Sequence, residues 1–282
     1  MKKSFTANYL QKLSLTLWRF NRFAMEIFYK NQRISNKLEW RDAFRRAYTE
    51  KGQTDKWKDG RSAERLANDF FQDTPKGISS GEKTIRNMIS FFTKCEKVNL
   101  DSAQIEYLSK FDSHNNPRQQ DLAIWGTVND TPLFVGLEAK VDEPFDNRSI
   151  EKARQAAKNS PTATDRISLL VEDFLKGIPE EEYNSFRYQL LFYLAGSLRE
   201  PSAEIIFMPV IVYVKGSVDY HEGNAAKNKK DYQQFMEKLF KPVPVPKNDE
   251  IELAYEQDFE TWDCERTKRI HRKVYSCYIV KR

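Results

Sequence analysis

The sequence predicts a mixed α/β protein with a helical N-terminal region. Apolar residues recur at helical spacing through the first hundred positions, strand-like runs begin at about residue 105, and helical and strand-like stretches then alternate. The chain has 282 residues, of which 40% are hydrophobic and 31% charged, so it can bury a full-sized core. Its 10 Gly and 11 Pro exclude collagen-like and low-complexity classes.

Positive charge is concentrated at the N-terminus. Residues 1–60 contain 14 Lys and Arg against 6 Asp and Glu, a local charge of +8 in a chain whose total is +5. The apolar residues from Leu10 to Ile27 have the spacing of an amphipathic helix. A basic segment favours a polyanionic partner such as nucleic acid, although a solvated helix face has the same composition. The candidate nucleic-acid contacts are Arg19, Arg22, Lys30 and Arg33, and the stripe itself is a candidate homodimer or partner surface.

Further helices are expected before residue 100, and no strand signal competes with them there. A second helix is predicted from about Leu38 to Thr49, and a third begins at a turn with Ser62 as its N-cap. Ser79 and Glu82 have the spacing of a capping box and open a fourth helix.

The middle of the chain then predicts strands. The candidates are 105–108, 121–125 and 132–137, and Asn129-Asp130 supplies a hairpin turn between the last two. Helices are expected at about 149–158, 166–176 and 181–198, and strands at 205–214, 251–255 and 274–280. Pro209 has no N–H to donate, so the strand at 205–214 is expected to end early, bulge or lie at an edge.

Charged side chains gather where the two hairpin strands are predicted to meet. Glu138 and Lys140 are two apart on a strand and share one face, and Asp121 begins the partner strand. Two carboxylates and an ammonium are costly together unless a divalent cation compensates them, and Mg²⁺ or Mn²⁺ suits Asp121, Glu138 and the carbonyl of Ala139. Lys140 would orient a water molecule for phosphodiester attack. The alternative is an ordinary Glu–Lys pair on an exposed strand end.

Two further residues extend this pattern. Gln189 and Tyr193 are four apart on the predicted helix at 181–198 and so share one face. With the order helix, strand, hairpin, helix, strand from about residue 82 to 214, the chain resembles the PD-(D/E)XK nuclease superfamily. The resemblance implies a restriction-endonuclease-like αβββαβ core, a mixed central sheet flanked by helices.

The same resemblance implies roles for individual residues. Asp121, Glu138 and Lys140 would hold the metal and the attacking water. Gln189 and Tyr193 look like the QxxxY motif of RecB-like members, which supports the active site and contacts the nucleic-acid backbone. Glu106 would match an additional upstream acid.

The sequence also departs from the superfamily pattern. Gln120 stands where the motif has a proline, and Asp142 and Glu143 are extra acids that would either serve the metal or cap a loop. Some members of the superfamily bind without cutting. The segments Trp57-x-x-Gly-Arg-Ser-Ala and 138–145 also resemble an uncharacterised bacterial family.

The expected activity is metal-dependent phosphodiester hydrolysis, with DNA preferred over RNA. The alternative is a non-catalytic nucleic-acid-binding or protein-interaction protein on the same fold, and a weaker third reading is a membrane-surface protein that uses the basic helix. Residues 1–78 are expected to form the helical basic region, and residues 79–282 the nuclease-like domain with a helical insertion at about 146–180. No run of 18 apolar residues and no cleavable leader is present, which predicts no membrane span and, by default, a cytoplasmic location.

Overall fold

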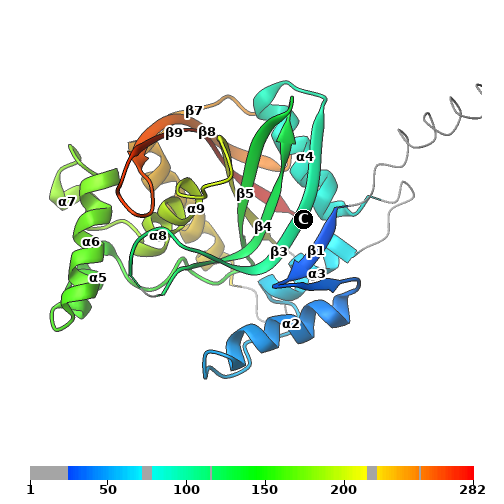
Figure 1. Ribbon diagram of the computed structural model, residues 1–282, viewed down its shortest axis with the longest axis horizontal. Helices are drawn as coiled ribbons and strands as arrows, with labels where there is room; N and C mark the ends of the chain where they lie inside the picture. The colour runs from blue at the N-terminus through cyan, green and yellow to red at the C-terminus, as the bar shows by residue number, and fades with distance from the viewer. Residues whose placement is uncertain (1–24, 72–77, 115, 215–220, 248) are drawn as a thin grey trace, which may run out of the picture.

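A computed structural model describes residues 25–71, 78–114, 116–214, 221–247 and 249–282. Within these ranges nine strands form one mixed sheet and eight helices flank it (Figure 1), which confirms the predicted α/β class. The strands are β1 (Glu26–Tyr29), β2 (Gln32–Ile34), β3 (Val98–Ser109), β4 (Arg118–Val128), β5 (Thr131–Lys140), β6 (Ile205–Tyr213), β7 (Lys241–Pro242), β8 (Ile251–Trp262) and β9 (Arg269–Lys281). The helices are α2 (Lys37–Thr49), α3 (Ser62–Phe71), α4 (Ser80–Thr93), α5 (Ile150–Ala157), α6 (Pro161–Phe174), α7 (Glu180–Tyr183), α8 (Tyr188–Leu198) and α9 (Glu222–Leu239).

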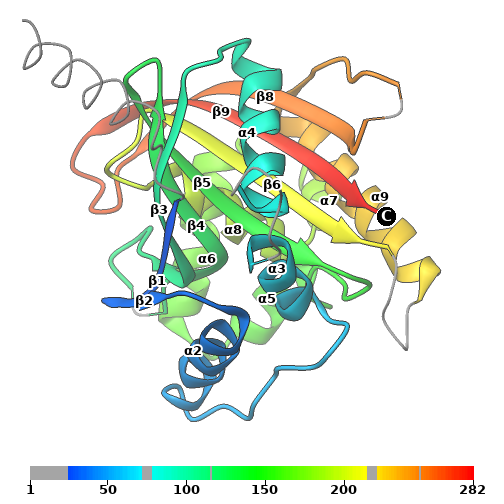
Figure 2. The same ribbon diagram turned by 90° about the vertical axis from the view of Figure 1, so that its right-hand side faces the viewer.

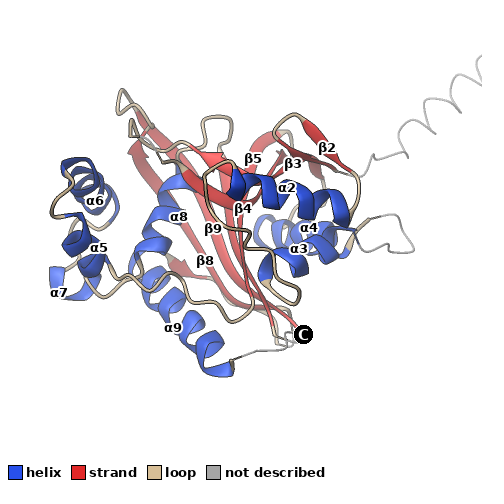
Figure 3. Ribbon diagram, turned by 90° about the horizontal axis from the view of Figure 1, so that it is seen from below, coloured by secondary structure: helices blue, strands red, loops and turns tan. Residues whose placement is uncertain are grey.

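Helices cover both faces of the sheet. Its strand order is β2-β1-β3-β4-β5-β6-β9-β8-β7. Apolar residues of α2, α3 and α4 pack against one face, and those of α8 and α9 pack against the other, where α5, α6 and α7 join the same apolar cluster from beyond α8 (Figure 3). The fold is therefore a three-layer α/β/α arrangement, and the described part of the N-terminal region shares its core with the sheet.

The centre of the sheet is an antiparallel meander joined to a parallel pair. Strand β4 pairs antiparallel with both β3 and β5, and β5 pairs parallel with β6. The turn between β4 and β5 contains Asn129 with φ 48° and Asp130 with φ 67°, which confirms the predicted hairpin. This turn places the start of β4 and the end of β5 together at the opposite end of the hairpin.

The prediction that the N-terminal hundred residues are entirely helical is wrong. Residues 1–24, which hold most of the Leu10–Ile27 stripe, lie outside the described residues. Ile27 itself lies in β1, where it alternates in burial with its neighbours and pairs with Ala103 of β3. Pairing with the sheet therefore overrides the local helical spacing, because it buries Ile27 and Tyr29 on the same face.

The expectation for Pro209 is also wrong. Strand β6 runs unbroken between β5 and β9, and Pro209 lies in its middle opposite Cys277. A single helix at 181–198 is likewise not found, because α7 ends at Tyr183 and α8 starts at Tyr188. The chain between them pairs with the start of α5, where the N–H of Ile150 donates to the carbonyl of Phe186 at 2.9 Å.

The other predicted helices and strands are found, several of them longer than predicted, but Ser62 is the first residue of α3 and not its N-cap, because its hydroxyl donates to Glu143 at 3.1 Å. Helix α2 matches the predicted second helix, and Ser79 caps α4 by accepting from the N–H of Glu82. Both C-terminal strands extend the sheet and are longer than predicted. Helix α9 begins at Glu222 and ends at Leu239. None of the described helices is long and apolar enough to cross a bilayer.

Candidate functional site

A recess of about 960 Å³ opens where β4 begins and β5 ends. Asp121, Glu138 and Lys140 line it from the sheet, and Gln189 lines it from α8. Helix α2, the start of α3 and the segment between them also line it, and Figure 2 shows where these elements lie relative to β4 and β5. Four of the predicted site residues are therefore brought together, from two strands and a helix that are up to 68 positions apart.

Glu138 is the most heavily contacted of these residues. Its Oε1 accepts from Nε2 of Gln189 at 2.7 Å and lies 2.9 Å from Nζ of Lys140. Its Oε2 accepts from the guanidinium of Arg118. All four of these side chains lie at the end of the sheet, and Glu138 itself is only 2% exposed. The carboxylate is thus compensated by two cations and one amide.

Asp121 lies beside Glu138 with fewer contacts. The regular pairing of β4 with β5 ends at Leu122 and Leu137, so Asp121 is just beyond it. Its Oδ2 accepts from the N–H of Ala139 at 2.7 Å. The predicted contribution of Ala139 was its carbonyl, whereas the contact seen involves its N–H. Asp121 also stays partly exposed, which leaves it accessible from the recess.

Glu106 joins the two acids from β3. Ile105 pairs with Leu122 and Tyr107 with Gln120, so Glu106 lies across from Asp121. It has a positive φ of 51°, which marks a local irregularity in the strand. Gln119 donates to Glu106, and Lys51, from the segment after α2, donates to Gln119.

The acidic and basic side chains of this cluster have shifted pKa values. Burial and the neighbouring Asp121 raise the pKa of Glu106 well above its usual value, and burial and Glu138 raise the pKa of Asp121 to about 7. Burial would raise the pKa of Glu138, but Lys140 and Arg118 outweigh it and lower that pKa. Burial would lower the pKa of Lys140, but Glu138 and Asp121 outweigh it and raise that pKa. Three carboxyl groups therefore share two nearby cations, Lys140 and Arg118, and the pKa values of two of the three acids are raised.

Tyr193 has a supporting position. It is 1% exposed, and its hydroxyl contacts the carbonyl of Gly136 and, at 3.0 Å, the carbonyl of Pro209. A side chain so deeply buried does not reach a bound nucleic acid. Of the two roles expected of Tyr193, its position favours support of the site.

The residues suit a magnesium-type ion in chemistry, although the arrangement seen is not that of a complete binding site. Carboxylate oxygens are the ligands that Mg²⁺ and Mn²⁺ prefer, and Asp121 and Glu138 present them from adjacent strands with Glu106 nearby. Among the described residues no three His, Cys, Asp or Glu side chains are grouped closely enough to hold a metal ion. Oδ1 of Asp121 has no hydrogen-bond donor among those residues. Binding at Glu138 would require its contacts with cationic side chains to rearrange.

The other sequence candidates lie elsewhere. Lys30 pairs with Glu50 and Arg33 with Glu26, so both basic side chains have carboxylate partners. Arg19 and Arg22 lie outside the described residues.

The extra acids that follow Lys140 connect loops. Asp142 accepts from Arg61 and, at 2.7 Å, from the N–H of His221. Glu143 accepts from the N–H of Val141 at 2.7 Å and from the hydroxyl of Ser62 at 3.1 Å. Both carboxylates thereby hold the chain after β5 against neighbouring segments.

Sequence reasoning missed the residue with the closest contact to Glu138. Arg118 lies three positions before Asp121, and its guanidinium also lies 5.8 Å from the centroid of the Tyr193 ring. Its Nε is buried without a hydrogen-bond partner. The available signal was a basic residue close to a predicted catalytic acid, which is common on protein surfaces and therefore weak.

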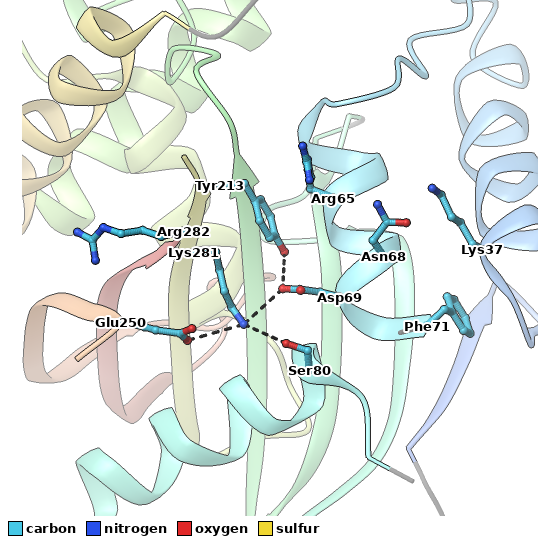
Figure 4. A pocket seen from close by; sticks show the side chains of 10 residues that line it. All are labelled: Lys37, Arg65, Asn68, Asp69, Phe71, Ser80, Tyr213, Glu250, Lys281 and Arg282. Atoms are coloured by element: carbon cyan, nitrogen blue, oxygen red, sulfur yellow. Dashed lines mark hydrogen bonds and ion pairs between the residues drawn. The ribbon is translucent and has the colours of Figure 1, made fainter. Parts of the chain in front are cut away.

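A second recess, of about 570 Å³, lies at the ends of β6 and β9. Figure 4 shows Lys281 at its centre, within 3.5 Å of Asp69 and 3.7 Å of Glu250, while the hydroxyl of Tyr213 donates to Asp69 at 3.0 Å. Lys281 also donates to Ser80 at 3.4 Å. The central lysine is thus compensated by two carboxylates, and this recess lacks the uncompensated acids of the larger one.

Comparison with known proteins gives a family without an assigned activity. The family described as a domain of unknown function (DUF6946) matches residues 37–260, a range that includes every described residue of the larger recess. No curated protein and no solved structure matches the chain.

Proposed function

This chain belongs to the DUF6946 family, and we propose that it is a metal-dependent nuclease. The observation that carries the proposal is the meeting of Asp121, Glu138, Lys140 and Gln189 in one recess. These residues are the D, E, K and Q of the D…ExK…QxxxY pattern. The direct bond from Gln189 to Glu138 supports the expected role of Gln189 in holding the site together.

The order of the elements also supports the proposal. From α4 the chain runs through β3, β4, β5, α8 and β6, the αβββαβ order that the resemblance to PD-(D/E)XK nucleases implies. In this reading the core is restriction-endonuclease-like, α5 to α7 form the insertion, and α2, α3 and the C-terminal strands are additions around it.

The proposed reaction assigns each residue a task. Asp121 and Glu138, with Glu106 and the carbonyl of Ala139 as further oxygen donors, would hold Mg²⁺ or Mn²⁺. When bound, such an ion stabilises negative charge on a phosphodiester and activates a water molecule. Lys140 stays protonated because Glu138 and Asp121 raise its pKa, so it acts as a hydrogen-bond donor that orients a water molecule or a phosphate oxygen. Gln189 fixes the carboxylate of Glu138.

The test is cleavage of single- and double-stranded DNA and RNA by the wild type and by Lys140→Ala, in Mg²⁺, Mn²⁺ and EDTA. We expect metal-dependent cutting, with DNA preferred, that falls about 100-fold or more in the variant, since loss of one electrostatic stabiliser commonly costs that much. Cutting that persists in EDTA or in Lys140→Ala would overturn the assignment.

Lys97→Ala is the matched control. Lys97 is an exposed lysine whose ammonium lies 2.6 Å from Asp130, at the β4–β5 turn and thus at the far end of the hairpin. Its removal should leave cleavage unchanged. A similar loss in both lysine variants would indicate a general effect of lowered charge on nucleic-acid binding.

One observation favours the non-catalytic alternative. Both carboxylate oxygens of Glu138 already accept hydrogen bonds, and an ion-pair network can serve structure alone. A protein of that kind would bind nucleic acid or another partner without cutting, and EDTA and Lys140→Ala would leave binding unchanged.

A further inference from the structure

The mouth of the larger recess carries lysines without acidic partners. Lys56 and Lys58 lie in the segment between α2 and α3 and line the recess, and both are exposed. Neither forms an ion pair within the part of the chain that the structure describes. The two aspartates of this segment have other partners, since Asp55 lies 2.8 Å from Arg45 and Asp59 accepts from the indole of Trp57 at 3.3 Å. The mouth of the recess is therefore locally positive, whereas its bottom is lined by acidic side chains.

An aromatic side chain lies beside these lysines. Tyr48, in the last turn of α2, lines the recess and is only half-buried. Nζ of Lys56 lies 5.1 Å from the centroid of its ring. The ring of Phe44 packs against the ring of Tyr48, with their centroids 4.7 Å apart. Trp57 packs edge-on against Phe44, with ring centroids 5.6 Å apart. A fixed aromatic ring next to ammonium groups that have no carboxylate partner is the combination that binds single-stranded nucleic acids.

The side chains at the base of the recess lie deeper than these groups. Glu138, Glu106 and Lys140 are 2%, 6% and 9% exposed, so a phosphodiester must enter the recess to reach them. A single strand can bend its backbone inward and leave a base against an aromatic ring. A duplex keeps its bases stacked and paired, and unstacking them costs free energy.

We propose that Tyr48, Lys56 and Lys58 form the binding surface for a single-stranded nucleic acid, with the lysines on backbone phosphates and the Tyr48 ring stacked on a base. This inference rests on the proposed function and names its substrate class. It places nucleic-acid binding at the mouth of the recess, in addition to any contribution from the N-terminal basic residues predicted from the sequence.

The first test measures binding in EDTA, where metal-dependent cutting is absent. Fluorescence anisotropy with a labelled single-stranded DNA, the same sequence as RNA, and a blunt DNA duplex should show at least tenfold tighter binding of the single strands. For a single strand the slope of log K against log salt changes by about 0.7 for each phosphate contact, so Lys56→Ala/Lys58→Ala should flatten it by about 1.4. Lys97→Ala/Lys268→Ala, at the other end of the sheet, should leave the slope unchanged.

The second test separates stacking from hydrogen bonding at Tyr48. Tyr48→Leu should weaken single-strand binding about fivefold or more, because a base–aromatic stack is lost. Tyr48→Phe keeps the ring and should bind as the wild type does, and urea unfolding of both variants controls for folding at this half-buried position.

The outcomes separate the inference from the proposed function. Equal affinity for the duplex, an unchanged salt slope in Lys56→Ala/Lys58→Ala, or equal weakening in the control pair would overturn the inference, even if Lys140-dependent cleavage were found. Single-strand binding through these residues without cleavage would overturn the proposed nuclease activity and support the binding surface.

Discussion

The hydroxyl of Tyr193 reaches the carbonyl of Pro209 at 3.0 Å, at the point where the parallel β5–β6 pair lacks a backbone donor. Val135 pairs with Phe207 and Glu138 with Val210, so Pro209 falls opposite Leu137. In a parallel ladder the N–H at position 209 would donate to the carbonyl of Gly136, and proline has none. The Tyr193 hydroxyl contacts that carbonyl instead. The tyrosine of the QxxxY pattern thereby allows a proline in a central strand.

Tyr193→Phe should therefore lower stability while leaving chemistry intact. The variant leaves buried carbonyl groups without their donor, a loss of about 1–3 kcal/mol in the free energy of unfolding. Urea unfolding measures it. Tyr188→Phe, the same change on the same helix, is the control, because its hydroxyl has no hydrogen-bond partner among the described residues. Cleavage lost in Tyr193→Phe at full stability would instead assign the hydroxyl a direct role.

Gln189 is expected to affect activity more than stability. Gln189→Ala removes the amide that fixes Oε1 of Glu138 while Arg118 and Lys140 still neutralise its charge. Loss of a side chain that orients a metal ligand commonly lowers activity or metal affinity about 10- to 100-fold. Single-turnover cleavage and Mn²⁺ titration calorimetry measure the two effects. An unchanged rate and an unchanged Mn²⁺ affinity would show that Gln189 is not a positioning residue.

The sequence predicted the central elements because their signals are local, and the resemblance to PD-(D/E)XK nucleases joined Asp121, Glu138, Lys140 and Gln189 into one site. Alternating apolar residues, the Asn129-Asp130 turn and the Ser79 cap each act within a few positions. Pairing over long distances is not visible in this way. Ile27 has helical spacing, yet it is buried in β1 because β1 pairs with β3. The expected interruption of the strand at Pro209 is not found, because the missing backbone donor is replaced by the hydroxyl of Tyr193 on another element.

The candidate site shows the same division. The spacing of Glu138 and Lys140 fixes their common face, so their contact was predictable. Arg118 and the link from Lys51 through Gln119 to Glu106 depend on how the start of β4 meets the α2–α3 segment. That relationship is tertiary, and no spacing in the sequence encodes it.

The contact between α2 and α3 predicts a pH dependence of stability. Burial would raise the pKa of Glu64, but hydrogen bonds from Lys37, the N–H of Gly60 and Asn68 outweigh it and lower the pKa. A lowered pKa stabilises the fold above the unfolded value of 4.5 and loses that effect as pH falls through the folded value. Glu64→Gln should thus lower the free energy of unfolding measured in urea by less than about 1 kcal/mol at pH 6, and by much less at pH 3.5.

The control for this prediction is Glu96→Gln, an exposed glutamate without an ion pair among the described residues. It should change the midpoint little at either pH. If the difference between the wild type and Glu64→Gln grew as the pH fell, the sign of the shift at Glu64 would be wrong.

The pair Arg118–Glu138 should be strongly coupled, because both side chains are removed from solvent, with 12% and 3% exposed. Breaking a buried pair by removing one partner commonly costs about 3–5 kcal/mol, and Lys140 still compensates Glu138, so Arg118→Met should lie at the low end of that range. In Arg118→Met/Glu138→Gln neither charge of the broken pair is left behind, so the double variant should be more stable than the sum of the two single changes predicts. Urea unfolding of all four proteins completes the double-mutant cycle. Additive losses would show that Arg118 acts on the fold by packing under α8 and not through the carboxylate of Glu138.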